Sequence, residues 1–217
     1  MKPFLTPGRG TTTRLTGMTD LTPRREATVG RLVEAAITQF AARGIDATSV
    51  EQLCDAAGFT RGAFYSNFTS KDDLCTAVIE RYRDNVLASL SETIAELPPE
   101  ADVKTVASTT LEHFLKVLAP SREMKVTLTE IRLRALRSPG LAAQLEQLSE
   151  ETRPALVGFI ESLAARMDVK FVLPTEHILT VFDALYSYEI QGYNKDSVRQ
   201  LLTPLAISLI SASGKPQ

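Results

Sequence analysis

The chain has 217 residues, 44% of them apolar, and a formal net charge of −2 at pH 7, so it is long enough to bury a core in one or two domains. It has no run of about 18 apolar residues and no apolar stretch of signal-peptide length near its start, so we expect neither a membrane span nor a secretory leader. Cys54 and Cys75 are the only cysteines, and we interpret them as small buried residues in a reducing cytoplasm. The absence of tryptophan and the scarcity of strand-like alternation favour an all-α protein.

Charge is distributed unevenly along the chain. Residues 1–69 hold eight Lys/Arg and six Asp/Glu, a difference of +2, whereas residues 70–217 hold sixteen and twenty, a difference of −4. The overall charge argues nothing for nucleic acid, but the N-terminal part is the plausible partner for a polyanion.

Residues 1–21 are rich in Thr, Gly and Pro and have no apolar period, so we expect a flexible tail. Its basic residues, Lys2, Arg9 and Arg14, would suit a DNA minor groove, although a tail without a function explains the composition better. Met18 is an alternative start of translation, which leaves open whether residues 1–17 are translated.

The first predicted helix begins at Thr22-Pro23 and ends at Gly44, because threonine caps a helix, proline is tolerated in its first turn and glycine ends it. It carries one apolar stripe: Val29, Leu32, Val33, Ala36, Ile37 and Phe40. We expect this stripe to pack across the two following helices in a three-helix domain. Arg24 and Arg25 in its first turn either contact a phosphate or remain solvated.

Two short helices are predicted next, joined by a tight turn at Gly58. The first spaces Val50, Leu53, Cys54 and Ala57 on one face, after a cap at Thr48 or Ser49. The second covers residues 61–67 after a cap at Thr60. Its inward residues are Ala63, Phe64 and Phe68, and its other face presents Arg61, Gly62, Tyr65, Ser66 and Asn67. Such a polar face is suited to phosphates and to base edges in a major groove.

Residues 56–71, Ala-Ala-Gly-Phe-Thr-Arg-Gly-Ala-Phe-Tyr-Ser-Asn-Phe-Thr-Ser-Lys, followed by Leu74, resemble the helix-turn-helix of TetR-type transcriptional regulators. In that family, a helix ending A-x-x-A-G runs into [T/S]-x-G-x-[F/L]-Y-x-x-F-x-[S/N]-K-x-x-L. Many members carry His at the position of Asn67 and Ala at that of Cys54, which are mild departures. The motif covers roughly the first third of the folded chain, and the remainder resembles the family only in its helical layout.

The resemblance implies a helix-turn-helix domain over 22–69 and an effector-binding and dimerisation domain over 70–217, with a connecting helix at 70–97. The DNA-contact candidates are Thr48, Thr60, Arg61, Gly62, Ala63, Tyr65, Ser66, Asn67 and Lys71. Arg61 suits a guanine or a phosphate, and Lys71 suits a phosphate. Thr48 resembles a phosphate-binding hydroxyl of the family, but both threonines would also serve simply as caps.

The rest of the chain is predicted to be helical. Ser70 caps a helix that runs to about Leu97, followed by helices over 102–118, 122–137, 140–167, 174–191 and 195–211. Pro154 either kinks the fourth of these six or begins another helix.

The last two predicted helices carry apolar stripes that are either ordinary core or, as the resemblance implies, the interface of a homodimer. These stripes are Ile178, Val181, Phe182 and Leu185 on one helix, and Val198, Leu201, Leu202, Leu205 and Leu209 on the other. The resemblance also places an effector pocket in this part of the chain. Its candidate residues are His113, Phe114, Arg132, Arg134, Phe182, Tyr186 and Tyr188.

Enzymatic motifs are absent from the sequence. His113 and His177 have no cysteine or acidic cluster at metal-ligand spacing, and there is no phosphate-binding glycine loop or nucleophile elbow. We therefore expect no cofactor, no metal and no catalysis.

The sequence favours a cytoplasmic, nucleoid-associated homodimeric repressor of a palindromic operator, released by a small-molecule effector. The alternatives are a chromosome-organising protein or an activator of the same fold. A further alternative is an all-α enzyme or adaptor whose resemblance to the motif is accidental.

Overall fold

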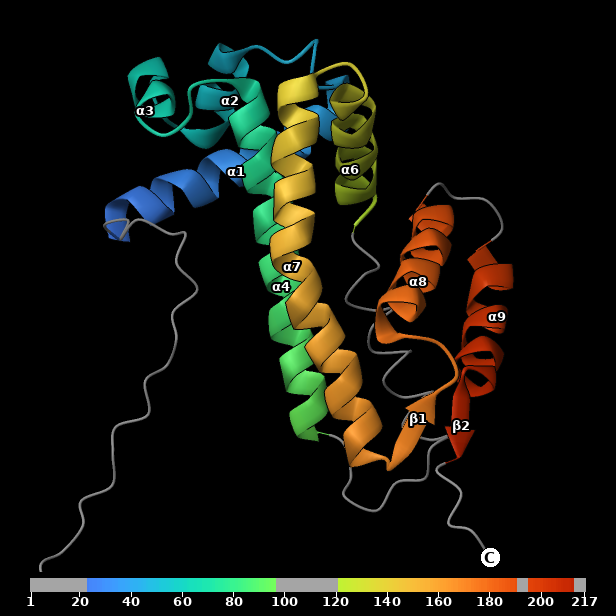
Figure 1. Ribbon diagram of the computed structural model, residues 1–217. Coiled ribbons are helices and arrows are strands. Elements are labelled where there is room, and N and C mark those ends of the chain that lie inside the picture. Colours follow the sequence, from blue (N-terminus) through green and yellow to red (C-terminus); the bar gives the residue numbers. More distant parts are fainter. Residues whose placement is uncertain (1–22, 97–120, 191–194, 213–217) are drawn as a thin grey trace, which may run out of the picture.

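The computed structural model describes residues 23–96, 121–190 and 195–212. Three helices form a head at one end of the molecule: α1 (Pro23–Arg43), α2 (Val50–Ala57) and α3 (Arg61–Tyr65). Two long helices, α4 (Lys71–Glu96) and α7 (Pro139–Arg166), run side by side away from this head (Figure 1). The shorter α6 (Arg122–Ala135) packs against α1, while α8 (Thr175–Ile190) and α9 (Lys195–Ser208) lie farther out.

Local sequence determines where the helices of the head begin and end. Ser49 caps α2, where its side chain and that of Gln52 bond each other's backbone N–H groups in a capping box. Gly58 ends α2 with a φ of +70°, a conformation that glycine adopts without strain. Thr60 then caps α3, accepting a bond from the N–H of Ala63. The turn between the two helices is thus encoded within about a dozen residues.

One hydrophobic core joins the head to the helices behind it. Phe40, Leu53 and Phe64 are fully buried and pack in the same cluster as Leu74 of α4 and Ile131 of α6. A fully buried phenylalanine stabilises a fold by roughly 1.5–3 kcal/mol relative to an exposed one. The position of the head is therefore tied to α4 and α6 by shared packing.

The predicted all-α class is confirmed, with local differences. The helix of α3 ends at Tyr65 rather than at residue 67, and Pro154 lies inside the continuous helix α7. The predicted helix over 102–118, with His113 and Phe114, lies outside the described residues.

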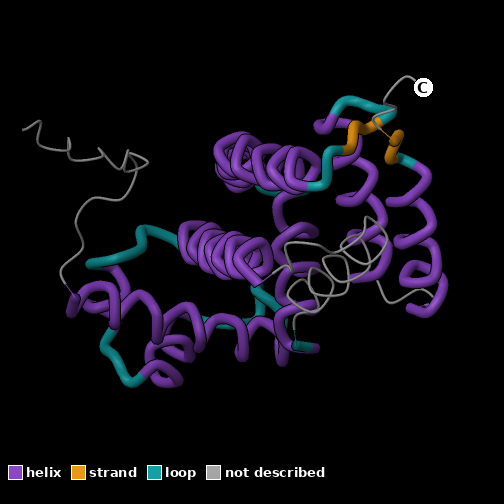
Figure 2. Tube along the Cα trace, turned by 90° about the horizontal axis from the view of Figure 1, so that it is seen from below, coloured by secondary structure: helices purple, strands orange, loops and turns teal. Residues whose placement is uncertain are grey.

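A short two-stranded ribbon was not predicted. Its antiparallel strands β1 (Val169–Phe171) and β2 (Ile210–Ala212) lie at the edge of the otherwise helical described chain (Figure 2). The last helix therefore ends at Ser208, and its predicted extension to residue 211 is wrong. The reason is tertiary, because residues 210–212 find strand partners that are about 40 positions away in the sequence.

Candidate DNA interface and effector cavity

The outer side of α3 is exposed, although the helix is anchored by its inner side. Phe64 is 0% exposed, whereas the next residue, Tyr65, is 51% exposed. The two rings meet edge to face, with centroids 5.3 Å apart, so the tyrosine ring is supported from below. Arg61, Gly62 and Ser66 share the exposed side. The result is a small, rigidly mounted surface of about one helical turn.

Arg61 is the cation on this surface, and a neighbouring helix orients it. Its Nη1 lies 2.9 Å from Oε1 of Glu51 on α2, and its guanidinium carbon lies 6.0 Å from the ring centroid of Tyr65. Both partners of this ion pair are largely exposed, and exposed pairs contribute only about 0–1 kcal/mol. The guanidinium is therefore held in place but can exchange the carboxylate for a stronger acceptor at little cost.

Packing within the head does not require a glycine at position 62. A Cβ at this position would meet only Oγ1 of Thr60, at an ordinary contact distance of 3.7 Å. Glycine lowers helix stability relative to alanine, so the absence of a side chain suits a close approach from outside the protein.

The two residues that follow α3 are partly occupied by bonds within the head. Nδ2 of Asn67 donates to the carbonyl of Ala63, and its Oδ1 accepts from Nε of Arg25. The hydroxyl of Ser66 donates to the carbonyl of Gly62. Asn67 thereby brings Arg25, in the first turn of α1, beside the exposed surface.

Thr48 does not lie where a phosphate could reach it, which corrects its assignment as a DNA contact. Its side chain is fully buried, and its hydroxyl donates to the carbonyls of Gly44, at 2.7 Å, and Gln39, at 3.4 Å. The capping role belongs to Ser49. Thr48 is a structural residue of the loop between α1 and α2, residues 44–49, which we call loop 44–49.

Lys71 is also a structural residue, which corrects its assignment as a phosphate clamp. Its ammonium donates to the carbonyls of Ile45, at 2.6 Å, Thr48, at 2.9 Å, and Asp46, at 3.4 Å. Burial, together with the nearby charge of Arg134, lowers the pKa of Lys71. An ammonium has three donors, and all three are directed at loop 44–49.

Helix α6 is bonded to the same part of the head. Oε2 of Glu130 accepts from the N–H of Ile45, and Arg134 contacts Asp46 and Asp72, each at 2.5 Å. The buried Thr127 of α6 also donates to the carbonyl of Ile37 on α1, at 2.9 Å. Arg134 was predicted to line the effector pocket, but in the structure it joins α6 to the head.

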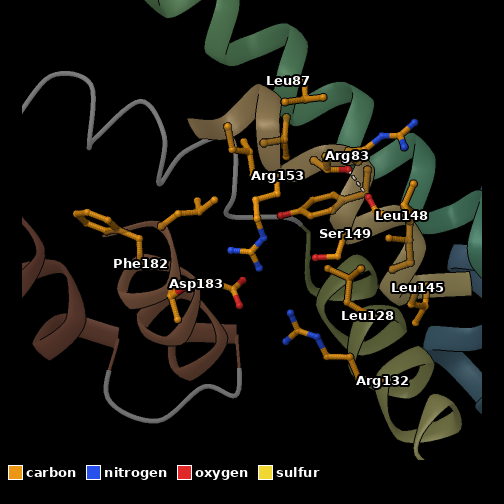
Figure 3. Close-up of a pocket in the computed structure, with 17 residues that line it drawn as sticks. Arg83, Leu87, Leu128, Arg132, Leu145, Leu148, Ser149, Arg153, Phe182 and Asp183 are labelled. Atoms are coloured by element: carbon orange, nitrogen blue, oxygen red, sulfur yellow. Dashed lines mark hydrogen bonds between the residues drawn. The ribbon is translucent and has the colours of Figure 1, made fainter. Parts of the chain in front are cut away.

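A cavity of about 490 Å³ lies between α4, α6, α7 and α8 (Figure 3). Arg132 and Phe182, two of the predicted pocket residues, line it. The sequence did not suggest Arg153 or Asp183, which also line it, because helical periodicity gives no sign that residues of different helices converge. His113 and Phe114 lie outside the described residues, as does the side chain of Tyr186.

Phe182, one of the predicted dimer residues, lines the cavity, and the others divide into three groups. Ile178 is only 2% exposed and Leu209 only 9%, so each packs within its own chain, which corrects their assignment to a subunit interface. Leu201 is 58% exposed, while Val181, Leu185 and Leu205 are half-buried. The side chains of Val198 and Leu202 lie outside the described ones.

The described part of the chain supports neither a metal site nor a membrane-spanning helix. Its side chains include no group of three His, Cys, Asp or Glu arranged to bind a metal ion. None of the described helices combines the length and the apolar character that crossing a bilayer requires.

Solved structures share this architecture over most of the chain. A TetR-family regulator from Mesorhizobium loti superposes with a TM-score of 0.68 at 17% identity, covering 88% of this chain and all of that one. One from a Rhodococcus species gives 0.69 at 18% identity, covering 86% and 100%. The family model of bacterial regulatory proteins of the tetR family matches residues 32–78, which run from the middle of α1 into α4. The head of the chain is therefore a TetR-family domain.

Curated relatives match from about a third to three fifths of this chain. The repressor KstR2 of Rhodococcus jostii is 26% identical over 132 residues, 60% of this chain and 62% of that protein. The activator FasR of Mycolicibacterium smegmatis is 31% identical over 70 residues, 32% of each chain. The chain thus spans less than two thirds of the length of these relatives, one of which is named a repressor and the other an activator.

Proposed function

We propose that the protein is a sequence-specific double-stranded DNA-binding regulator, and that the outer side of α3 enters the major groove. The observation that carries this proposal is the contrast between Phe64 and Tyr65, a buried anchor next to an exposed ring, beside an oriented Arg61. Arginine suits guanine or phosphate, and an aromatic ring suits a thymine methyl group or the sugar-phosphate backbone. The match of residues 32–78 to the tetR family model supports the same assignment.

The regulator acts as a homodimer on a palindromic operator. One α3 contacts roughly three or four base pairs, at about 1–3 kcal/mol of discrimination each. Selecting one site among about 10⁶ competing ones requires roughly 8 kcal/mol, which a single head barely supplies. Two heads on a two-fold axis nearly double the discrimination, and they require half-sites about 34–36 Å apart or a related spacing.

Helices α8 and α9 supply the dimer surface. They expose large apolar side chains in the single chain, namely Tyr188, Leu201 and Ile207. Burying such side chains against a second copy supplies the apolar core that homodimer interfaces need.

A small-molecule effector in the cavity releases the DNA. Helix α6 faces the cavity with Leu128 and Arg132, and contacts the head through Glu130 and Arg134. Helix α4 likewise lines the cavity and begins at Lys71, beneath loop 44–49. A ligand that shifts either helix changes the spacing of the two heads. A 100-fold loss of operator affinity requires about 2.8 kcal/mol of coupling.

Selection of binding sites from random duplex DNA with the full-length protein tests this function. We expect an inverted repeat, bound by two chains, and affinity that falls steeply with salt. Enrichment of no sequence at all, with a solution mass that corresponds to one chain, would contradict the proposal.

Activation of transcription is a second candidate beside repression, since the relative FasR is named as an activator. A reporter gene placed behind the selected site distinguishes the two, because a repressor lowers transcription and an activator raises it. Footprints spread along DNA without a preferred site would instead indicate a chromosome-organising protein. The proposed place of action is the cytoplasm, where bacterial DNA lies.

A further inference from the structure

Two arginines from different helices reach into the cavity. Figure 3 shows the charged ends of Arg132, from α6, and Arg153, from α7, directed into the same space. Neither guanidinium forms an ion pair with any residue that the structure describes. A third arginine of the wall, Arg83, lies 2.8 Å from Asp84 and is already neutralised.

The remainder of the wall is predominantly apolar. The aliphatic and aromatic residues of the lining include Ile79, Val86, Leu128, Leu148, Leu156 and Phe182. The volume of about 490 Å³ falls within the range of about 300–1,000 Å³ that small-molecule sites occupy. The cavity therefore combines an apolar body with a localised cationic group.

One carboxylate belongs to the same group. Asp183 of α8 also lines the cavity, and Figure 3 shows its carboxylate near the ends of the two arginines. Without Arg83, the charged lining from the described residues consists of two guanidiniums and one carboxylate, which leaves one positive charge uncompensated among them. A cationic ligand would be repelled by this positive charge. A neutral ligand would remove water from two guanidiniums without replacing the hydrogen bonds that the water made.

We propose that the effector is an amphipathic anion, whose carboxylate or phosphate group is bound between Arg132 and Arg153 and whose apolar part occupies the rest of the cavity. The guanidinium fork matches both oxyanions, and such charge-assisted bonds are roughly twice as strong as neutral ones. This inference rests on the proposed effector-binding role of the cavity. Because Arg132 is on α6, the bound anion acts on the helix that holds loop 44–49.

The test measures binding to the free full-length protein by calorimetry, without DNA. The probes share one alkyl chain below its micelle concentration: decanoate, decyl phosphate, decanol and decyltrimethylammonium. We expect at least one anion to bind tenfold or more tightly than decanol, and the cation to bind most weakly. The ratio of decanoate to decyl phosphate affinity tells a carboxylate ligand from a phosphate one.

Three variants and a matched control locate the anion. R132Q and R153Q should each weaken binding of the preferred anion about tenfold or more and change decanol binding less than threefold. R122Q removes the same charge from the first turn of α6, outside the cavity lining, and should leave both unchanged. D183N should strengthen anion binding, because it removes the like charge.

The outcomes separate this inference from the proposed function. Equal affinity for anion and alcohol, preference for the cation, failure of every probe to bind, or an unchanged anion affinity in both arginine variants would overturn the anionic class. Operator selection without ligand is unaffected by any of these results. Anion binding by a protein that selects no DNA site would leave the ligand class standing and overturn the DNA-binding function.

Discussion

The outer side of α3 and loop 44–49 are both polar and lie close together in sequence, but their polar groups differ in how fully they are bonded. On α3, Tyr65 is half exposed and Arg61 has a single exposed carboxylate partner. In loop 44–49, the groups of Thr48 and the backbone carbonyls are bonded to one another and to Lys71. The comparison separates polar groups that can bind a partner from those that hold the head together.

The largest expected effect tests the anchor of α3 against its exposed neighbour. Phe64→Ala should lower the free energy of unfolding by about 3–5 kcal/mol, because it leaves a cavity in the core. Tyr65→Ala should change it by less than about 1.5 kcal/mol and still abolish tight operator binding. Urea unfolding and titration of the selected operator measure both. A Tyr65→Ala protein that binds normally would remove α3 from the interface.

Arg61→Ala tests the cation on the exposed side. We expect about 1–3 kcal/mol less operator binding free energy and relaxed preference at one base position in each half-site. Stability should change by less than about 0.5 kcal/mol, because the lost ion pair with Glu51 is exposed. Repeated site selection with the variant reads out the base preference, and Glu51→Gln serves as the control that disrupts the pair but keeps the guanidinium.

Lys71→Met tests whether the bonds from Lys71 to loop 44–49 hold the head together. It leaves carbonyls of loop 44–49 without their donor, so we expect the free energy of unfolding to fall by about 1–3 kcal/mol. The salt dependence of operator binding should keep the wild-type slope, because no phosphate contact is lost. A shallower slope with unchanged stability would restore Lys71 to the DNA interface.

Arg134→Met removes the contacts of α6 with Asp46 and Asp72. Asp46 is exposed, so its share is small, but Asp72 is mostly buried and would lose its guanidinium partner, keeping the hydrogen bond from Ser138. We expect a loss of about 1–2 kcal/mol in unfolding free energy. Arg137→Met, a nearby exposed arginine, should have no measurable effect, and equal losses in both variants would deny Arg134 a special role.

Gly62→Ala gives a small expected change in stability that is opposite in sign to its expected effect on operator binding. The space at position 62 admits a methyl group, and alanine favours the helix, so stability should rise by up to about 1 kcal/mol. Operator affinity should fall, because the methyl group would stand between α3 and the DNA backbone. A variant that is both more stable and a better binder would show that nothing approaches α3 closely there.

Local features of the head were predictable from sequence because they depend on neighbours along the chain. The caps at Ser49 and Thr60, the turn at Gly58 and the inward face with Phe64 follow from a few adjacent residues. Thr48 was assigned wrongly because the same hydroxyl can cap, bind phosphate or be buried, and only packing decides between these.

The cavity was less predictable because its lining comes from four helices that are far apart in sequence. Arg132 and Phe182 were anticipated from the family layout, but Arg153 and Asp183 were not. The sequence also gave no sign that residues 210–212 pair with 169–171, since a short apolar segment fits a helix or a strand equally well.

Methylation protection of guanine N7 in the selected operator tests the central claim most directly, because N7 lies in the major groove. The account predicts two protected clusters related by a two-fold axis and separated by about one helical turn or a multiple of it, both lost in Tyr65→Ala. Guanines that stay fully reactive in the bound complex, or one protected cluster without symmetry, would contradict it.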